Sequence, residues 1–260
     1  SVSSWADTDI SFIVPSWANG GPNSVDVLAG NVASNNLSFI VTPYIGGVWP
    51  SPAYGGQIIT INGTGFGQAP GSLLIGGLTA AVTSWSQGII TAVLPQAIEA
   101  GVHEVVVLTS YGVSNAFPLL VTPYISSLNP GSERGGNMVT LTGSGFGALQ
   151  GTGQVLVGGI PAQTSAWSNT LISIVVPDIV GPGPCWTAAI AGGLWSNSMG
   201  FTVLPSLSAI TPNKGSAGTT VLLTGANLWS SYLTGTVYFN GAPADSALSW
   251  VMASIVVTVP

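Results

Sequence analysis

The stretch Ile61-Asn62-Gly63-Thr64-Gly65-Phe66-Gly67 decides the fold, because it returns 80 residues later as Leu141-Thr142-Gly143-Ser144-Gly145-Phe146-Gly147. Each copy follows a short run rich in β-branched residues, which is typical of a strand. Gly225-Ala226-Asn227-Leu228-Trp229 is a degenerate third copy that departs at its centre. A motif that recurs at a fixed spacing indicates an internal repeat.

Other landmarks share this period. Thr42-Pro43-Tyr44-Ile45 recurs as Thr122-Pro123-Tyr124-Ile125. A tryptophan stands ten residues before a proline in four places: Trp5 and Pro15, Trp85 and Pro95, Trp167 and Pro177, and Trp250 and Pro260. A Ser-Asn pair precedes a final apolar strand in three places: Ser34-Asn35, Ser114-Asn115 and Ser196-Asn197. One period near 80 therefore organises nearly the whole chain.

The chain is out of phase with its repeat. Residues 1–41 match the second half of a unit (the N-terminal partial repeat), and 205–260 match a first half (the C-terminal partial repeat). Residues 42–121 and 122–204 are the first and second complete repeats. We expect either a window from a longer repetitive polypeptide or head-to-tail completion of half-domains between subunits. The Trp-to-Pro strand occurs in both partial repeats, which favours the window.

Within a repeat the pattern is all β. Short apolar runs such as 58–62, 73–75 and 89–94 alternate with turn residues. Gly76-Gly77 and Gly158-Gly159 stand where two-residue hairpin turns are expected. Six or seven short strands in about 80 residues predict a small immunoglobulin-like sandwich. Because the junctions contain Pro43, Pro123 and Pro205 and no Gly/Ser linker, the sandwiches are expected to form a rod.

The order of these residues resembles the IPT/TIG domain. The order is an opening Pro, the Gly-x-Gly-Phe-Gly motif, an aliphatic strand with a Gly-Gly turn, a Trp strand that ends at Pro, and Ser-Asn before a closing Phe strand. The resemblance implies an immunoglobulin-like fold found in plexins, some transcription factors and many bacterial surface proteins. It implies no single function, because one fold hosts unrelated roles.

A glycine-rich motif also invites a phosphate-binding interpretation. Such loops need a following helix whose N–H groups meet the anion. Here Gln68-Ala69-Pro70-Gly71 and another strand follow, with no basic residue nearby. We therefore expect the glycines to serve a strand-to-strand turn with positive φ, and the Phe to plug the end of the sandwich.

Composition excludes several classes of function. The 260 residues include 2 Lys and Arg against 8 Asp and Glu, which gives a net charge of −6. Nucleic-acid binding needs basic side chains to neutralise phosphates, so it is not expected, and neither is affinity for anionic membranes. Apolar runs are broken well before about 18 residues, so no membrane insertion is expected.

The residues offer no catalytic set. His103 and Cys185 occupy the same position of consecutive repeats, so we expect each to be a half-buried packing residue and not part of a dyad. Asp7 and Asp9 would share one face of a strand and contribute at most to a weak Ca²⁺ site, although a solvated face is the simpler interpretation. We predict no enzyme activity, no cofactor and no metal.

Five tryptophans lack a tryptophan at the equivalent position of the other units: Trp17, Trp49, Trp186, Trp195 and Trp229. Trp186 corresponds to Glu104 and Trp195 to Val113. Because the shared fold does not require them, each either packs on a neighbouring domain or subunit, or stacks on a sugar ring. The in-register tryptophans are instead expected at the core or its rim.

The low fraction of charged residues predicts that much of the surface of the sandwiches is covered. Charged residues are 4% of the chain against roughly 25% in typical soluble domains, so the outer faces should lie against copies of the chain or under glycans. Asn36-Leu37-Ser38 and Asn62-Gly63-Thr64 are acceptor sequons, which makes Asn36 and Asn62 candidate glycosylation sites.

The leading hypothesis is an extracellular structural protein whose tandem repeats assemble with copies of themselves into a filament or cell-surface layer. The alternative is an adhesin or carbohydrate-binding stalk that uses the unrepeated tryptophans to contact surface glycans. An accessory region of an enzyme is a third hypothesis, with any activity outside these residues.

Overall fold

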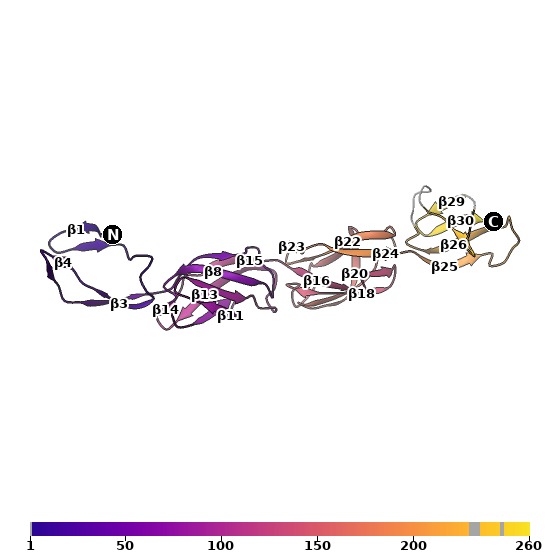
Figure 1. Cartoon of the computed structure of the whole chain (residues 1–260). Coiled ribbons are helices and arrows are strands. Elements are labelled where there is room, and N and C mark those ends of the chain that lie inside the picture. Colours follow the sequence, from indigo (N-terminus) through magenta and orange to yellow (C-terminus); the bar gives the residue numbers. More distant parts are fainter. Residues whose placement is uncertain (1, 229–234, 245–246) are drawn as a thin grey trace. The chain divides into compact units, whose positions relative to one another are not determined.

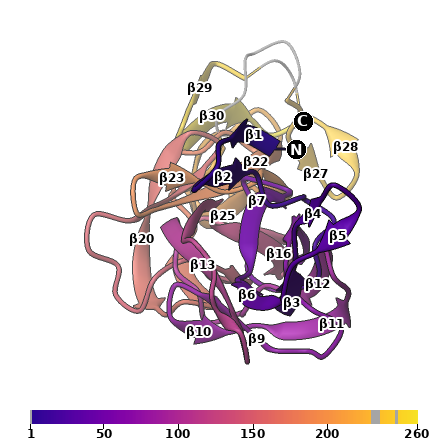
Figure 2. The ribbon, with the colours of Figure 1, turned by 90° about the vertical axis from the view of Figure 1, so that its left-hand side faces the viewer.

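The computed structural model describes residues 2–228, 235–244 and 247–260, and all regular structure in these ranges is β (Figure 1). Figure 2 gives the view turned by 90° and likewise shows strands joined by loops. The chain divides into two compact units, Ser1–Thr122 and Pro123–Pro260. The prediction of an all-β fold of immunoglobulin-like sandwiches is confirmed.

The first complete repeat is a two-sheet sandwich. One sheet has the order β11-β12-β8-β7, and the other has β10-β9-β13-β14 with β15 paired to β13. Its strands are β7 (Tyr44–Trp49), β8 (Ile58–Thr64), β9 (Ser72–Ile75), β10 (Leu78–Thr79), β11 (Ala81–Trp85), β12 (Ile89–Val93), β13 (Gly101–Thr109), β14 (Gly112–Val113) and β15 (Phe117–Val121).

Alternation along the strands builds the core of this repeat. On β8, Ile59 and Ile61 are fully buried, whereas Ile58 is exposed and Thr60 lies between these extremes. Side chains of period two point to opposite faces of a strand, so one face of each sheet meets the other. Val105 and Val107 of β13 close the core from the second sheet.

The second complete repeat has the same sandwich with one difference. Its strands are β16 (Tyr124–Asn129), β17 (Ser132–Arg134), β18 (Met138–Ser144), β19 (Gln154–Val157), β20 (Ile160–Trp167), β21 (Leu171–Val175), β22 (Gly183–Ala191), β23 (Leu194–Trp195) and β24 (Met199–Leu204). The strand β20 is continuous and pairs with β19 at one end and β21 at the other. Both sheets thereby join into the order β16-β18-β21-β20-β19-β22-β24-β17, with β23 paired to β22.

The two partial repeats are half-sandwiches. Residues 2–41 form three strand pairs from β1 (Val2–Trp5), β2 (Ile10–Phe12), β3 (Gly21–Val25), β4 (Leu28–Ala29), β5 (Val32–Ala33) and β6 (Leu37–Val41). Residues 205–260 form the sheet β25-β26-β30-β29 and the pair β27-β28. Their bounds are β25 (Ser206–Thr211), β26 (Thr220–Ala226), β27 (Tyr238–Phe239), β28 (Ala242–Pro243), β29 (Ser249–Val251) and β30 (Ser254–Thr258).

The repeated glycine motif is structural, as expected. Gly65 and Gly145 have φ of 72° and 75°, and Phe66 and Phe146 are almost completely buried. Asn227 takes the same position with φ of 55°, a region that Asn enters more readily than most side chains. Asn227 therefore keeps the left-handed backbone conformation of Gly65 and Gly145.

Asn227 also joins the C-terminal partial repeat to the second complete repeat. Its Oδ1 accepts from the Gly135 N–H at 2.9 Å, and its Nδ2 donates to the carbonyls of Pro177 and Val180 at 3.1 and 2.7 Å. The backbone N–H of Asn227 donates to the Asp178 carbonyl. The side chain is completely buried and therefore desolvated. These hydrogen bonds offset the free-energy cost of removing its polar atoms from water.

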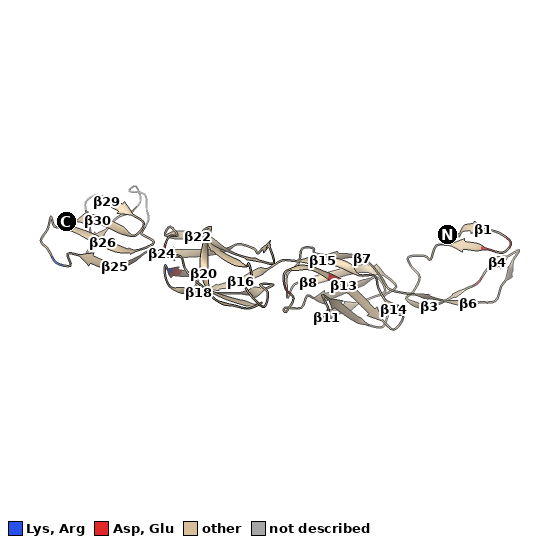
Figure 3. Ribbon diagram, turned by 180° about the vertical axis from the view of Figure 1, so that it is seen from behind, with Lys and Arg blue, Asp and Glu red and all other residues tan. Residues whose placement is uncertain are grey.

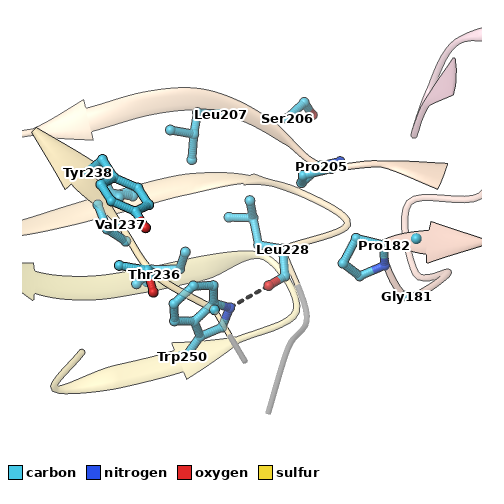
Figure 4. Close-up of a pocket in the computed structure, with 14 residues that line it drawn as sticks. Gly181, Pro182, Pro205, Ser206, Leu207, Leu228, Thr236, Val237, Tyr238 and Trp250 are labelled. Atoms are coloured by element: carbon cyan, nitrogen blue, oxygen red, sulfur yellow. Dashed lines mark hydrogen bonds between the residues drawn. The ribbon is translucent and has the colours of Figure 1, made fainter. Parts of the chain in front are cut away.

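The in-register tryptophans behave as predicted in three of their four positions. Trp85 and Trp167 are half-buried against Phe66 and Phe146, with ring centroids 6.3 and 6.4 Å apart. Trp250 is half-buried and donates to the Leu228 carbonyl. Figure 4 shows this bond.

The expectation for Trp5 is wrong, since its side chain is 56% exposed. Residues 1–41 contain no counterpart of Phe66 against which it could pack. The prediction for Asp7 and Asp9 is also wrong, because they lie in the turn between β1 and β2 and not on a strand. That turn is closed by the bond from the Ala6 N–H to the Asp9 carbonyl.

Candidate functional site

The unrepeated tryptophans are solvent-accessible wherever the structure describes them. Trp17, Trp49 and Trp195 are 80%, 71% and 54% exposed, and Trp186 is 41% exposed. Trp229 lies outside the described residues. A tryptophan that is left in water retains a large apolar surface that a ligand or partner can bury.

Trp186 and Trp195 share one outward face of the second complete repeat. On β22, Cys185 and Ala189 pack into the core, so the alternate residues Trp186 and Ile190 point outward. On β23, Trp195 is directly opposite Ile190. Directly opposed residues of an antiparallel pair lie on the same face. The two indoles therefore project from the same side of the sheet that contains β19, β22 and β24.

The residues between the two indoles are apolar. Ala188 lies on the outward side of β22 midway between Trp186 and Ile190, and its exposure of 1% shows that larger neighbouring side chains cover it. Its cross-strand partner is the half-buried Leu156. We call these five residues, Leu156, Trp186, Ala188, Ile190 and Trp195, the tryptophan face.

Small residues flank Trp186 on both sides. Gly200 is its partner on β24, and the turn Gly158-Gly159 lies on the other side. The indole Cζ2 is 3.8 Å from the position that a Cβ would take on Gly159. The indole thus lies close to that glycine turn, where no side chain covers it.

Polar side chains lie at the margins of the tryptophan face. Gln154 is exposed beside Ile190, and Thr202 stands on β24 two residues from Gly200. The strands β19, β22, β23 and β24 contain no Asp, Glu, Lys or Arg. The neighbouring strand β17 carries Glu133 and Arg134, of which Arg134 pairs with Leu204 at the end of β24.

The first complete repeat has no such face. Glu104 and Val113 occupy the positions of Trp186 and Trp195 on the corresponding strands β13 and β14. Trp49 is exposed on β7 of the other sheet, and Trp17 is exposed in the loop before β3. Among the unrepeated tryptophans that the structure describes, Trp186 and Trp195 share one face, a relationship that sequence reasoning missed. The parity of β22 and the two-residue turn Gly192-Gly193 could have revealed it.

The titratable groups that the structure describes lie in different surroundings. His103 is half-buried, and its Nε2 lies 2.9 Å from the Glu99 carbonyl oxygen. Burial raises the pKa of the half-buried Cys185 thiol, which packs against the core. Hydrogen bonds from the Asn137 side chain and the Arg134 N–H lower the pKa of Glu133. Within the described ranges, no three His, Cys, Asp or Glu side chains gather as metal ligands.

An open apolar groove of about 1000 Å³ is lined mainly by the C-terminal partial repeat, together with residues 181–183 of the second complete repeat. Leu207, Leu228, Tyr238 and Trp250 surround it (Figure 4). In the complete repeats the equivalent inner face is covered by strands such as β22 and β24, which residues 205–260 do not contain. A similar groove of about 550 Å³ opens on the inner face of the N-terminal partial repeat. Both grooves are exposed core surfaces.

The sequons are accessible. Asn36 is exposed immediately before β6, and Asn62 is exposed on the outward face of β8.

Charged residues are sparse along the ribbon in Figure 3. Among the described residues there is no helix long and apolar enough to cross a bilayer.

A family model of the IPT/TIG domain matches residues 43–119, 123–203 and 205–260. The chain belongs to the IPT/TIG domain family. The resemblance drawn from the glycine motif, the Trp-to-Pro strand and the Ser-Asn pair is thereby confirmed.

The curated proteins whose sequences are similar to this chain are of different kinds. Fibrocystin-L of Mus musculus is 31% identical over 223 residues, which is 78% of this chain and 5% of that protein. Cyclomaltodextrin glucanotransferase of Bacillus sp. (strain 1-1) is 33% identical over 99 residues, or 38% of this chain and 14% of the enzyme.

Among solved structures, SGBP-B of the Bacteroides ovatus mixed-linkage glucan utilization locus, in complex with a mixed-linkage heptasaccharide, superposes with a TM-score of 0.29 at 15% identity. That match covers 79% of this chain and 66% of SGBP-B. Of the first curated relatives the chain spans only a small part, 5% of fibrocystin-L and 14% of the glucanotransferase.

Proposed function

We propose that these IPT/TIG domains form a non-catalytic stalk of an extracellular protein and bind carbohydrate through tryptophans that the repeats do not share. The observation that carries the proposal is the pair Trp186 and Trp195 on one outward face. An indole stacks on the C–H face of a pyranose ring through the same apolar and polarisation forces that pair aromatic rings.

Two further observations support a carbohydrate ligand. The first complete repeat keeps the fold with Glu104 and Val113 at these positions, so the two tryptophans are not needed for the sandwich. One relative of known activity is named for a carbohydrate substrate, and the match covers 38% of this chain. Trp17, Trp49 and Trp229 are additional candidate contacts.

Affinity electrophoresis of the purified chain through gels that contain dissolved polysaccharides, with pull-down on insoluble ones, tests this proposal. We expect retention by at least one polysaccharide and loss of retention in the double variant Trp186→Glu with Trp195→Val. This variant installs the residues of the first complete repeat. Leu149→Ser is the matched control, because it removes an 84% exposed side chain from the loop before β19 of the same domain. Absence of retention on every polysaccharide would overturn the proposal.

We also propose self-association into a filament or surface layer as a second function. Large apolar side chains are exposed in both units, including Val102 and Leu207, and the chain has few charges to oppose contact. Light scattering and electron microscopy at rising concentration test this, with filaments or sheets expected. A chain that remains monomeric at high concentration would exclude it.

Finally, we propose Asn36 and Asn62 as N-glycan acceptors in a host that glycosylates secreted proteins. Exposure of both side chains supports the assignment. Mass spectrometry after expression in such a host is expected to find glycan at these asparagines. Unmodified peptides at both positions would exclude it.

A further inference from the structure

We infer that the tryptophan face binds the flat surface of an insoluble, uncharged β-1,4-linked polysaccharide, cellulose or chitin, and not single soluble oligosaccharides. This inference rests on the proposed carbohydrate-binding function and names the ligand class for the same face.

The spacing of the indoles requires an extended ligand. Trp186 and Ile190 are four residues apart on β22, which is about 13 Å at the rise of a strand. Trp195 is directly across from Ile190. The distance between the two indole positions exceeds the width of one pyranose ring, so a ligand that stacks on both has several rings in line. A chain of β-1,4-linked pyranoses is extended and presents ring faces along its length.

The shape of the tryptophan face favours a flat ligand. Gly200 beside Trp186 has no side chain, and the small Ala188 between the indoles is covered by its larger neighbours, so no polar group stands up between the two indoles on β22. The turn Gly158-Gly159 and Gly200, which flank Trp186 on its two sides, have no side chains to wall it in. A flat, open platform complements a flat surface and makes few contacts with a single flexible chain.

The chemistry of the face favours a crystal surface over a dissolved sugar. A dissolved oligosaccharide keeps its hydroxyls hydrated, so a site that binds it supplies several hydrogen-bonding groups to replace that water. Here the polar side chains on the paired strands are Gln154 and Thr202 at the margins, and the segment between β23 and β24 adds the exposed Ser198. A crystalline polysaccharide already pairs most of its hydroxyls within the solid and exposes ring C–H faces, which need only an apolar partner.

The absence of charge on β19, β22, β23 and β24 selects against anionic glycans. An acidic polysaccharide would need cationic side chains to offset its desolvation, and Arg134 lies on β17 beyond the end of β24 that is remote from Trp195. The net charge of −6 adds repulsion of any polyanion.

Adsorption of the full chain to crystalline cellulose, crystalline chitin, amorphous cellulose and alginate tests the inference, with cellohexaose and chitohexaose as soluble competitors. We expect adsorption to at least one crystalline polymer, with no competition by the hexasaccharides. Trp186→Glu and Trp195→Val are each expected to lower the partition constant about tenfold, because each removes one large buried apolar contact. Leu149→Ser is expected to bind as the parent chain does.

Near-UV circular dichroism establishes that each variant is folded. If Trp186→Glu does not fold, Trp186→Ser replaces it, since Ser24 stands at this position in the N-terminal partial repeat. Competition by a hexasaccharide, or preference for alginate, would overturn the inference and leave the proposed function intact. Adsorption that survives both tryptophan variants would overturn it as well. Failure to bind any polysaccharide, soluble or insoluble, would overturn both.

Discussion

The side-chain amide of Asn115 forms hydrogen bonds with both backbone polar groups of Ile45, 70 residues earlier in the chain. Its Oδ1 accepts from the Ile45 N–H at 2.7 Å, and its Nδ2 donates to the Ile45 carbonyl at 3.1 Å. Asn197 binds Ile125 in the same way at 2.7 and 2.9 Å. The repeated asparagine therefore ties the end of each complete repeat to its first strand.

Replacement of Asn115 by Ala is expected to destabilise the first complete repeat by about 1–3 kcal/mol, because two backbone groups of the fully buried Ile45 lose their partners. Urea unfolding followed by tryptophan fluorescence measures the change. Asn35→Ala is the control, since Asn35 has the same repeat position and is exposed. Equal stability of Asn115→Ala and Asn35→Ala would contradict this account.

A methyl group at Gly63 is expected to destabilise the same repeat severely. The Cβ would lie 2.1 Å from the Tyr44 carbonyl oxygen and 2.4 Å from the Phe66 ring, and backbone on a paired strand cannot move away cheaply. We expect Gly63→Ala to cost at least about 1–3 kcal/mol by overpacking. Gly47→Ala on the adjacent strand is the control, because a Cβ there meets nothing within 4 Å. Thermal unfolding of the two variants checks the difference.

Asn227→Gly and Asn227→Ala separate two roles of one residue. Glycine accepts the positive φ but loses the bonds to Gly135, Pro177 and Val180, at an expected cost of about 1–3 kcal/mol. Alanine loses the same bonds and adds about 1–2 kcal/mol for the left-handed backbone.

Hydrogen exchange at Leu223 and Ile255 in the core of the C-terminal partial repeat reports these changes. Asn240→Gly is the control, because Asn240 also has positive φ but is exposed in a hairpin turn. Faster exchange in Asn240→Gly than in Asn227→Ala would contradict the assignment.

The Cys185 thiol is expected to react slowly in the native chain. Burial raises its pKa, and the hydrogen bond with the Gly158 backbone opposes part of that rise. At pH 8 the native thiolate fraction is therefore smaller than in the unfolded chain, and alkylation by iodoacetamide should be slower before denaturation than after it.

The same shift makes stability depend on alkaline pH. Below the ordinary pKa of a thiol, both folded and unfolded chains hold the proton, and the contribution of Cys185 to stability is fully present. As the pH rises past that value the unfolded chain releases its proton first, so the free energy of unfolding falls. Cys185→Val is expected to remove this part of the alkaline slope, and an unchanged slope would contradict the pKa shift.

The internal repeat made it possible to predict the fold from the amino-acid sequence alone. The positive φ of Gly65, the buried Phe66 and the paired turn Gly76-Gly77 all follow from residues whose steric demands are local. The error at Asp7 and Asp9 arose because alternate residues share a face only within a strand, and Asp is a residue that favours turns, where the strand ends here. The error at Trp5 arose because in-register position predicts burial only where the packing partner is part of the chain.

The tryptophan face, too, was predictable from the sequence only in part. Composition and comparison of repeats singled out Trp186 and Trp195 one by one, since neither is required by the shared sandwich. Their common outward face depends on the register between β22 and β23, and a shift of one residue would have put one indole in the core. Order along the chain was enough to reveal strands, turns and the repeat, because local sterics control them. Which distant side chains share a surface was settled by strand pairing, a long-range property that no short stretch of residues encodes.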